Sequence, residues 1–245
     1  MKKYIAVIAL IVMCMVYIAS YAETTENGNE IIVEKETIIN LDYGEDATFG
    51  ETYYVAYIKN VSDHTLWVDP TELILYNKEN DVIKEDDMPY LVGSMYMEPG
   101  EVSVVSFCPM VYKSNNADIK AETAKLCLEY SEPEKGYYDV IIDDKKADMT
   151  GSFDKEKFEV KGSVTNKDTR SWQDAKITIV MEDENGNPLF AYMGYADEFM
   201  KPGDTEEFSY AFEKPSTCKR LKEYMIENKI NINNVRVFCV YEIIE

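Results

Sequence analysis

The sequence predicts an all-β fold made of two tandem antiparallel β-sandwiches, with a short helix in the second. Short runs rich in Val, Ile, Tyr and Thr recur between turns of Asn, Asp, Gly and Pro, as in sheet proteins. An ordered series of landmarks also occurs twice along the chain. Finally, 245 residues with 46% apolar content suffice for one or two hydrophobic cores.

Residues 1–22 are typical of a secretory signal. Lys2 and Lys3 form a basic start, 5–18 is an uninterrupted apolar run, and 20–22 offers a cleavage site. We therefore expect cleavage before Glu23 and a secreted or cell-surface protein without a membrane span. An uncleaved anchor is the alternative, but about 14 apolar residues are fewer than the roughly 20 that cross a bilayer.

Residues 49–110 and 158–212 carry the same landmarks in the same order. Each has a strand ending in an Asn turn, a Trp followed by Asp, a second strand closed by a turn, and a Pro-Gly pair before a last strand. The corresponding positions are Asn60 and Asn166, Trp67 and Trp172, strands 73–77 and 179–183, turns 79–81 and 184–186, and turns 98–101 and 201–204. Five landmarks in one order predict a duplicated sandwich, with domains at 23–133 and 134–245.

Turn residues predict particular turn types. The Asn-Gly pair at 185–186 is typical of a type I′ hairpin, whose two central residues both need positive φ. The Pro-Gly pairs at 99–100 and 202–203 suit type II turns, in which Gly takes the positive-φ position. Strands at 31–39 and 137–142 would begin the two units.

One segment, 215–229, has helical rather than strand periodicity. Ser216 can cap its start, and we expect about three turns. Its apolar face contains Cys218, Leu221 and Met225. The first repeat has only a shorter helix candidate at 117–125.

Four cysteines follow the signal. Cys108 and Cys127 are 19 residues apart, and Cys218 and Cys239 are 21 apart. Because export permits disulfides, we expect one bridge in each repeat, Cys108–Cys127 and Cys218–Cys239. Closing loops of this size would stabilise the fold by roughly 3 kcal/mol each. The alternative is four buried thiols, which behave as small apolar side chains.

The end of the second strand carries a family resemblance. Leu73, Leu75, Tyr76 and Asn77 stand as in an F-x-L-Y-D strand end, with Leu for Phe and Asn for Asp, whereas the second repeat keeps only Asp183. With the Asn turn and the Pro-Gly pair, each repeat resembles the FxLYD-type and related immunoglobulin-like extracellular domains of Gram-positive secreted proteins and lipoproteins. The resemblance implies immunoglobulin-like sandwiches that act as non-catalytic surface modules.

Composition excludes several classes of function. With 25 basic and 46 acidic residues, the net charge of −21 repels a phosphate backbone, which excludes nucleic-acid binding. His64 is the single histidine and sits in a turn, so multi-histidine metal sites are excluded. Phosphate-binding and dinucleotide glycine motifs are absent, as is a G-x-S-x-G sequence. We expect no cofactor, no metal and no catalytic residue.

Three acidic clusters, at 85–87, 143–144 and 182–185, could in principle hold calcium. Their spacing does not match a calcium-binding loop. Counted from Asp183 as the first position, Gly186 is at the fourth position, whereas such a loop has its glycine at the sixth. We interpret them as solvated turns. Paired carboxylates can also hydrolyse glycosides, but with 46 acids any two can be nominated, so the pattern has no specificity.

The outward positions of one strand differ between the repeats. Alternation in the second repeat directs Val160, Gly162 and Val164 toward the core. The outward positions are Tyr53, Val55 and Tyr57 in the first repeat and Glu159, Lys161 and Ser163 in the second. The apolar stripe of the first repeat is therefore a candidate binding face. It could be covered by the chain itself, form a protein interface, or stack against sugars.

We therefore expect a non-enzymatic interaction module whose partner is an extracellular protein or glycan. Carbohydrate binding through exposed tyrosines of the first domain is the alternative within the binding class. An extracellular hydrolase is the rival from a different class, and it would need a cleft with convergent carboxylates.

Overall fold

The computed structural model describes residues 30–41, 49–86, 90–91, 93–108, 110–112, 120–133, 146–195, 199–211 and 215–244. The expected signal at 1–22 and the expected strand at 137–142 lie outside this part of the chain. Within it, no helix is both long and apolar enough to cross a membrane.

Almost every described element is a β-strand. The first half contains β1 (Ile31–Leu41), β2 (Phe49–Asn60), β3 (Leu66–Tyr76), β4 (Val82–Asp86), β5 (Tyr90–Leu91), β6 (Tyr96–Met97), β7 (Val102–Phe107), β8 (Met110–Tyr112) and β9 (Thr123–Ser131). The second half contains β10 (Ala147–Asp154), β11 (Glu159–Asn166), β12 (Ser171–Glu182), β13 (Pro188–Tyr195), β14 (Phe199–Met200), β15 (Thr205–Ala211), α2 (Pro215–Glu227) and β16 (Asn234–Ile244).

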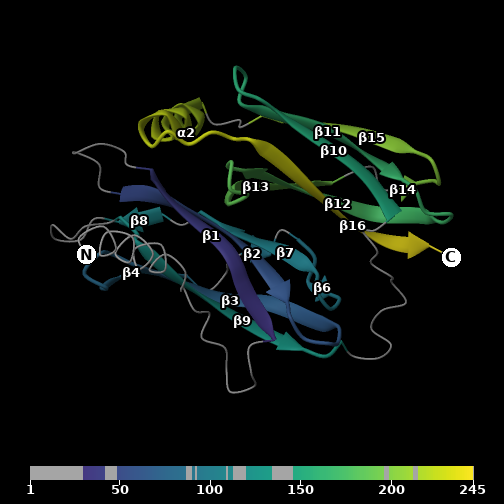
Figure 1. Cartoon of the computed structure of the whole chain (residues 1–245), viewed down its shortest axis with the longest axis horizontal. Helices are drawn as coiled ribbons and strands as arrows, with labels where there is room; N and C mark the ends of the chain where they lie inside the picture. The colour runs from purple at the N-terminus through teal and green to yellow at the C-terminus, as the bar shows by residue number, and fades with distance from the viewer. Residues whose placement is uncertain are drawn as a thin grey trace, which may run out of the picture.

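Each half forms two antiparallel sheets with matching strand order. In the first half, β1-β2-β7-β5 forms one sheet with β8 on β2, and β4-β3-β6 forms the other with β9 on β3. In the second half, the sheets are β10-β11-β15, and β13-β12-β14 with β16 on β12. These orders correspond to strands A-B-E and C′-C-F of an immunoglobulin sandwich. Figure 1 shows the sheets stacked in layers. The predicted all-β fold with one short helix is confirmed.

Three apolar clusters hold the layers together. One lies between the two sheets of the first half and includes Tyr54, Leu73 and Val105. A second lies within the second half and includes Trp172, but it also takes in Ile39 from the end of β1. The third lies between the halves. Strand β1 therefore contributes to both sandwich cores, since Ile31 near its start belongs to the first.

The repeated Asn turn is the same in both halves to the level of single hydrogen bonds. The side-chain amide of Asn60 or Asn166 closes the turn and also ties it to a short strand of the other sheet. Asn60 Nδ2 donates to His64 O (2.9 Å) and Met97 O (2.9 Å), and Asn166 Nδ2 donates to Arg170 O (3.0 Å) and Met200 O (3.0 Å). Both asparagines are fully buried, so the two turns need this residue for the same physical reason.

The Pro-Gly turns are also equivalent. Gly100 has φ of 82° and Gly203 has φ of 87°, which confirms the two predicted type II turns. Each glycine N–H donates to the carbonyl of the repeated asparagine, at 2.9 Å in both halves. The turn that precedes the last strand is therefore fastened to the end of the first aligned strand.

Some local predictions were wrong. Gly186 has φ of 69°, but Asn185 does not have positive φ, so the hairpin is not type I′. Instead Asp183 Oδ1 accepts hydrogen bonds from the backbone N–H groups of Asn185 and Asn187, both at 2.8 Å, and organises a longer loop. Of the helix candidate 117–125, residues 123–125 belong to strand β9. Among the described residues, the second half begins with β10, and the expected strand at 137–142 stays a prediction.

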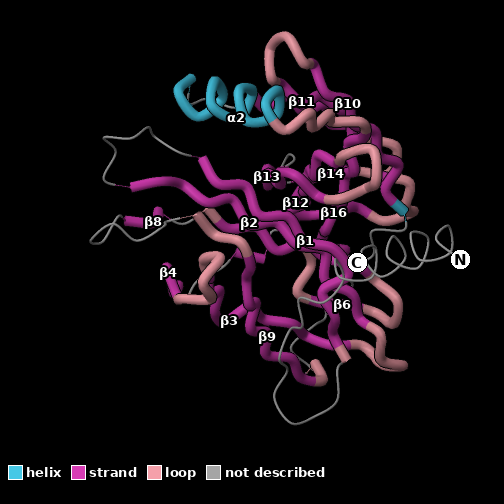
Figure 2. Tube along the Cα trace, turned by 60° about the vertical axis from the view of Figure 1, so that its left-hand side comes forward, coloured by secondary structure: helices cyan, strands magenta, loops and turns pink. Residues whose placement is uncertain are grey.

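The predicted helix of the second half is confirmed as α2. Leu221 is fully buried in the second core, and Met225 packs against the same core. Figure 2 shows α2 lying beside the sheet that contains β10 and β11. The helix connects β15 with β16, where the first half has no described helix.

Candidate functional site

The predicted binding face on β2 is buried inside the protein. Val55 has 0% and Tyr57 has 2% of its surface exposed, and Tyr53 is half-buried. Val55 and Tyr57 belong to the cluster between the halves, together with Val180 of β12 and Phe238 of β16. Of the three predicted interpretations, coverage by the chain's own elements is therefore the one that the structure bears out.

A polar network lies inside this apolar contact. The Tyr57 hydroxyl donates to Glu182 Oε1 at 2.6 Å, and Asn234 Nδ2 donates to Glu182 Oε2 at 2.8 Å. The Arg236 guanidinium lies over the rings of Tyr57 and Phe238, at 5.2 and 4.5 Å from their centroids. Burial raises the pKa of Tyr57, and the bond to Glu182 raises it further. The phenol therefore stays protonated and donates.

The same contact continues along β1 and β2. The Tyr53 ring meets Phe190 of β13 edge-on, with centroids 5.7 Å apart. Lys35 Nζ donates to the backbone carbonyls of Asn185 and Gly186, at 2.7 and 3.0 Å. Because Tyr53, Val55 and Tyr57 face the other half, they cannot form the exposed sugar platform that the alternative prediction requires.

Neither of the two expected disulfides is formed. Cys108 lies exposed just after β7, and Cys127 lies on β9 in the opposite sheet, so the expected Cys108–Cys127 bridge is not formed. Cys127 Sγ instead donates to Glu72 Oε2 at 3.6 Å. Cys239 is buried in the second core. The side chain of Cys218 lies outside the described part, but Cys239 forms no disulfide, so the expected Cys218–Cys239 bridge is not formed either.

The described acidic and histidine candidates have structural roles, whereas residue 87 and the cluster at 143–144 lie outside the described part of the chain. Glu182 of the cluster at 182–185 is the buried acceptor for Tyr57, and Asp183 organises a turn. His64 Nδ1 is 3.1 Å from Asp63 Oδ1, and this contact raises the pKa of the exposed histidine. Among the described residues, no group of three or more His, Cys, Asp or Glu is placed to hold a metal ion.

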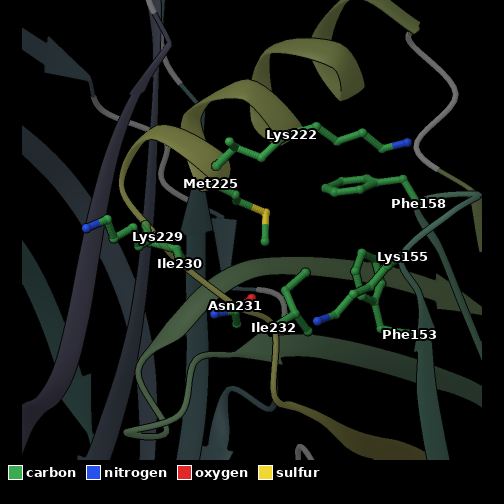
Figure 3. A pocket seen from close by; sticks show the side chains of 10 residues that line it. Phe153, Lys155, Phe158, Lys222, Met225, Lys229, Ile230, Asn231 and Ile232 are labelled. Carbon is green, nitrogen blue, oxygen red and sulfur yellow. The ribbon is translucent and has the colours of Figure 1, made fainter.

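A pocket of about 370 Å³ lies between the end of α2 and the tip of the β10–β11 hairpin. We call it the α2 pocket. It is lined by Phe153, Lys155, Phe158, Lys222, Met225, Ile226, Lys229, Ile230, Asn231 and Ile232 (Figure 3). Its volume lies within the range of small-molecule sites, and apolar side chains form most of its wall.

The hairpin tip builds one wall. Asp154 Oδ1 accepts hydrogen bonds from the N–H groups of Glu156 and Lys157, at 2.9 and 3.2 Å, which folds the turn. Phe158 then adopts φ of 53°, an unfavourable conformation for a bulky residue. Its ring is buried and meets Phe153 edge-on, with centroids 5.1 Å apart. Packing of this aromatic pair against the second core compensates for the strained backbone.

The end of α2 builds the opposite wall. Ile230 N–H donates to Met225 O at 2.8 Å, and Lys229 N–H donates to Ile226 O at 3.2 Å. This pair of bonds is the Schellman motif, with Lys229 in the left-handed conformation at φ of 56°. The motif turns the chain back and places Ile230 beside Met225. Ile226 stays 77% exposed at the mouth.

Lysines supply the charge of the α2 pocket. Three of its ten residues are lysines and none is acidic, in a chain with 46 acidic and 25 basic residues. Lys222 Nζ lies 5.4 Å from the Phe158 ring centroid and donates to Glu156 O at 3.3 Å. In Figure 3, Lys222 extends over Phe158 and Lys155 reaches toward Ile232, whereas the ammonium of Lys229 points away.

These residues can bind but offer little for catalysis. The lining contains no carboxylate, histidine, hydroxyl or thiol side chain, so it has no general base paired with a nucleophile. An apolar floor with ammonium groups at its edge is suited to a ligand with an apolar body.

Sequence reasoning found the helix but missed the α2 pocket. Phe153 and Phe158 come from a hairpin, and Met225 and Ile230 come from the chain some 70 residues later. One available signal was the helix itself, which interrupts the second repeat where the first has no described equivalent. A second signal was the exposed Ile226 among charged residues.

Comparisons with known proteins give no family. No family model matches the chain, and no curated protein matches it. One similar solved structure is red sea bream transglutaminase, with 9% identity and a TM-score of 0.20 over 73% of this chain. Another comes from a chaperone–tip adhesin complex of CFA/I fimbriae biogenesis, with 10% identity and a TM-score of 0.16, covering 71% of this chain and 87% of that one. This chain covers 27% of the transglutaminase chain, and neither likeness bears on function.

Proposed function

We propose that the protein is an exported, non-enzymatic binding module, secreted or held at the cell surface, and that the α2 pocket is its binding site. The observation that carries the proposal is the apolar recess between Phe153, Phe158, Met225 and Ile230, which has an exposed isoleucine at its mouth.

Three further observations support this proposal. The signal-like segment 1–22 favours export, and the resemblance to FxLYD-type domains implies a surface module. The residues that line the recess lack a catalytic pair.

The neutral fluorophore N-phenyl-1-naphthylamine tests whether the α2 pocket takes an apolar ligand. We expect saturable binding to the chain from Glu23 to Glu245, with enhanced fluorescence. Ile226→Glu places a charge at the mouth and should abolish the enhancement. Val82→Glu is the matched control, because Val82 is another exposed apolar side chain, 50% exposed and on β4 of the first half. It should bind the probe like the wild type.

Two results would contradict the proposal. One is the absence of saturable probe binding by the folded wild type. The other is equal loss of binding in Ile226→Glu and Val82→Glu, since it would place the probe elsewhere. Far-ultraviolet circular dichroism of each variant establishes that it is folded.

A further inference from the structure

We propose that the ligand of the α2 pocket is a single-chain amphipathic carboxylate, such as a medium-chain fatty acid, with its tail on the apolar floor and its carboxylate held by Lys155 and Lys222. This inference rests on the proposed function and adds the chemical class of the ligand.

The floor fits an unbranched apolar tail. Phe153 and Phe158 form one side, and Met225 and Ile230 form the other, so aromatic, thioether and branched side chains meet around one space. Methionine adapts its shape to flexible apolar ligands. Burial of each methylene group from water favours binding by about 0.8 kcal/mol.

The rim fits an anionic head. In the described part of the chain, the ammonium groups of Lys155 and Lys222 lie within ion-pair distance of no carboxylate. Lys222 is held by the Phe158 ring and the Glu156 carbonyl, neither of which neutralises its charge. Both lysines therefore retain positive charge that a carboxylate can pair with.

The charge of the whole chain makes this local arrangement selective. A net charge of −21 opposes the approach of anions over most of the surface. At physiological salt, dissolved ions screen this repulsion between charges that are more than about 8 Å apart. A pocket edged by Lys155 and Lys222, with no acidic residue in its lining, is thus a place where an anion is favoured once its tail is buried.

Displacement of N-phenyl-1-naphthylamine by decanoate and by decanol tests the head group. The two competitors have the same tail length, and decanoate is ionised near pH 7. The variants are Lys155→Gln, Lys222→Gln and the double variant. Lys219→Gln is the matched control, because it removes an equal charge from the same helix at a side chain that is 77% exposed and does not line the pocket.

We expect decanoate to displace the probe from the wild type. Each of Lys155→Gln and Lys222→Gln should raise the decanoate concentration required by roughly fivefold, and decanol should be unaffected. Lys219→Gln should change decanoate binding by less than about twofold. Added salt should weaken decanoate and leave decanol unchanged.

The inference is overturned if the double variant weakens decanoate and decanol equally, if Lys219→Gln acts as strongly as Lys222→Gln, or if decanoate fails to displace a probe that binds. In each case the probe itself still binds, so the proposed function survives. Loss of probe binding by the folded wild type would instead contradict the proposed function.

Discussion

The two repeats share their turns and differ in their outer surfaces. Asn60 and Asn166 make the same pairs of hydrogen bonds, yet the strands that they end present opposite chemistry on the outward face. In the first repeat this face carries Val55 and Tyr57 and is buried against the second. In the second repeat the corresponding strand carries exposed Lys161. Turn residues thus specify the sandwich, and outward residues specify how sandwiches pack.

The polar outer face of the second repeat ends the stack of sheets. Its hydroxyl groups pair with one another across strands, as in Thr150 with Ser163 at 3.0 Å and Thr165 with Thr205 at 2.9 Å. In the described strands of this sheet, hydroxyl groups therefore stand on the outer face where the first repeat has Val55 and Tyr57. Polar end faces of this kind keep stacked repeats soluble.

The other face of each sandwich shows the same contrast. In the second repeat, Glu182 on β12 accepts the hydrogen bond from Tyr57, and Val180 belongs to the same apolar cluster as Val55. At the same distance from the turn, the first repeat has Tyr76 and Ile74 on β3. Tyr76 offers a neutral phenol in place of the carboxylate that accepts the Tyr57 hydrogen bond, so the corresponding faces of the two repeats differ in charge.

The largest expected effect comes from exchanging one outward residue. Val55→Lys gives the first repeat the residue that the second has at Lys161, and it buries an unpaired charge in the contact. We expect a loss of about 3–5 kcal/mol in the free energy of unfolding. The reciprocal Lys161→Val should change stability by less than about 0.5 kcal/mol, because that side chain is exposed. Urea denaturation measures both, and equal effects would remove the contrast.

The Asn turns test the shared skeleton. Asn60→Ala and Asn166→Ala each leave a buried carbonyl, that of Met97 or Met200, without its side-chain donor and also remove a second, part-buried bond, so each should cost roughly 2–4 kcal/mol. The two losses should agree within about 1 kcal/mol. The same urea titrations measure both variants. A large loss in the free energy of unfolding at one turn and none at the other would show that the two turns are not energetically equivalent.

A smaller effect is expected at the Pro-Gly turns. A Cβ at Gly100 or Gly203 meets no atom within 4 Å. The cost of an alanine there therefore comes only from the positive φ of the backbone. We expect each Gly→Ala change to cost about 1–2 kcal/mol. Thermal unfolding followed by circular dichroism gives both values, and the matched control Gly→Asn should cost less because Asn tolerates this conformation better.

The smallest effect concerns a residue without a charged equivalent in the first repeat. Burial alone would raise the pKa of Asp168, but bonds from Arg170 and Lys146 outweigh it and hold the pKa well below its usual value. The contribution of Asp168 to the free energy of unfolding is therefore complete above about pH 4, and it is lost as the pH falls toward the lowered pKa. Asp168→Asn should cost about 0.5–1 kcal/mol at neutral pH and reduce the acid sensitivity. If the free energy of unfolding of Asp168→Asn varied with pH between about pH 2 and pH 5 as that of the wild type does, this explanation would be contradicted.

Turn chemistry made much of the fold predictable. Pro99-Gly100 and Pro202-Gly203 specify positive φ locally, and alternating Val160 and Val164 specify the core face of one strand. The helix was equally local, because Leu221 and Met225 share one face. Each of these predictions depends on residues within a few positions of one another.

The site was less predictable because it is non-local. The bond between Tyr57 and Glu182 joins residues 125 positions apart, so a stripe of tyrosines cannot reveal whether it is covered or exposed. The spacing of the cysteines likewise cannot show that Cys108 follows a strand of one sheet whereas Cys127 lies on a strand of the other. The α2 pocket combines a hairpin tip with a helix end, and neither motif alone indicates a recess.

The most direct test is whether the two repeats unfold together. The chain has two tryptophans, Trp67 in the first repeat and Trp172 in the second, so Trp67→Phe and Trp172→Phe each leave a reporter for one repeat. In each variant, tryptophan fluorescence and far-ultraviolet circular dichroism are followed through the same urea titration. The buried contact around Tyr57 predicts coincident transitions within each variant. Two separated transitions would contradict the conclusion that this contact makes the repeats one cooperative unit.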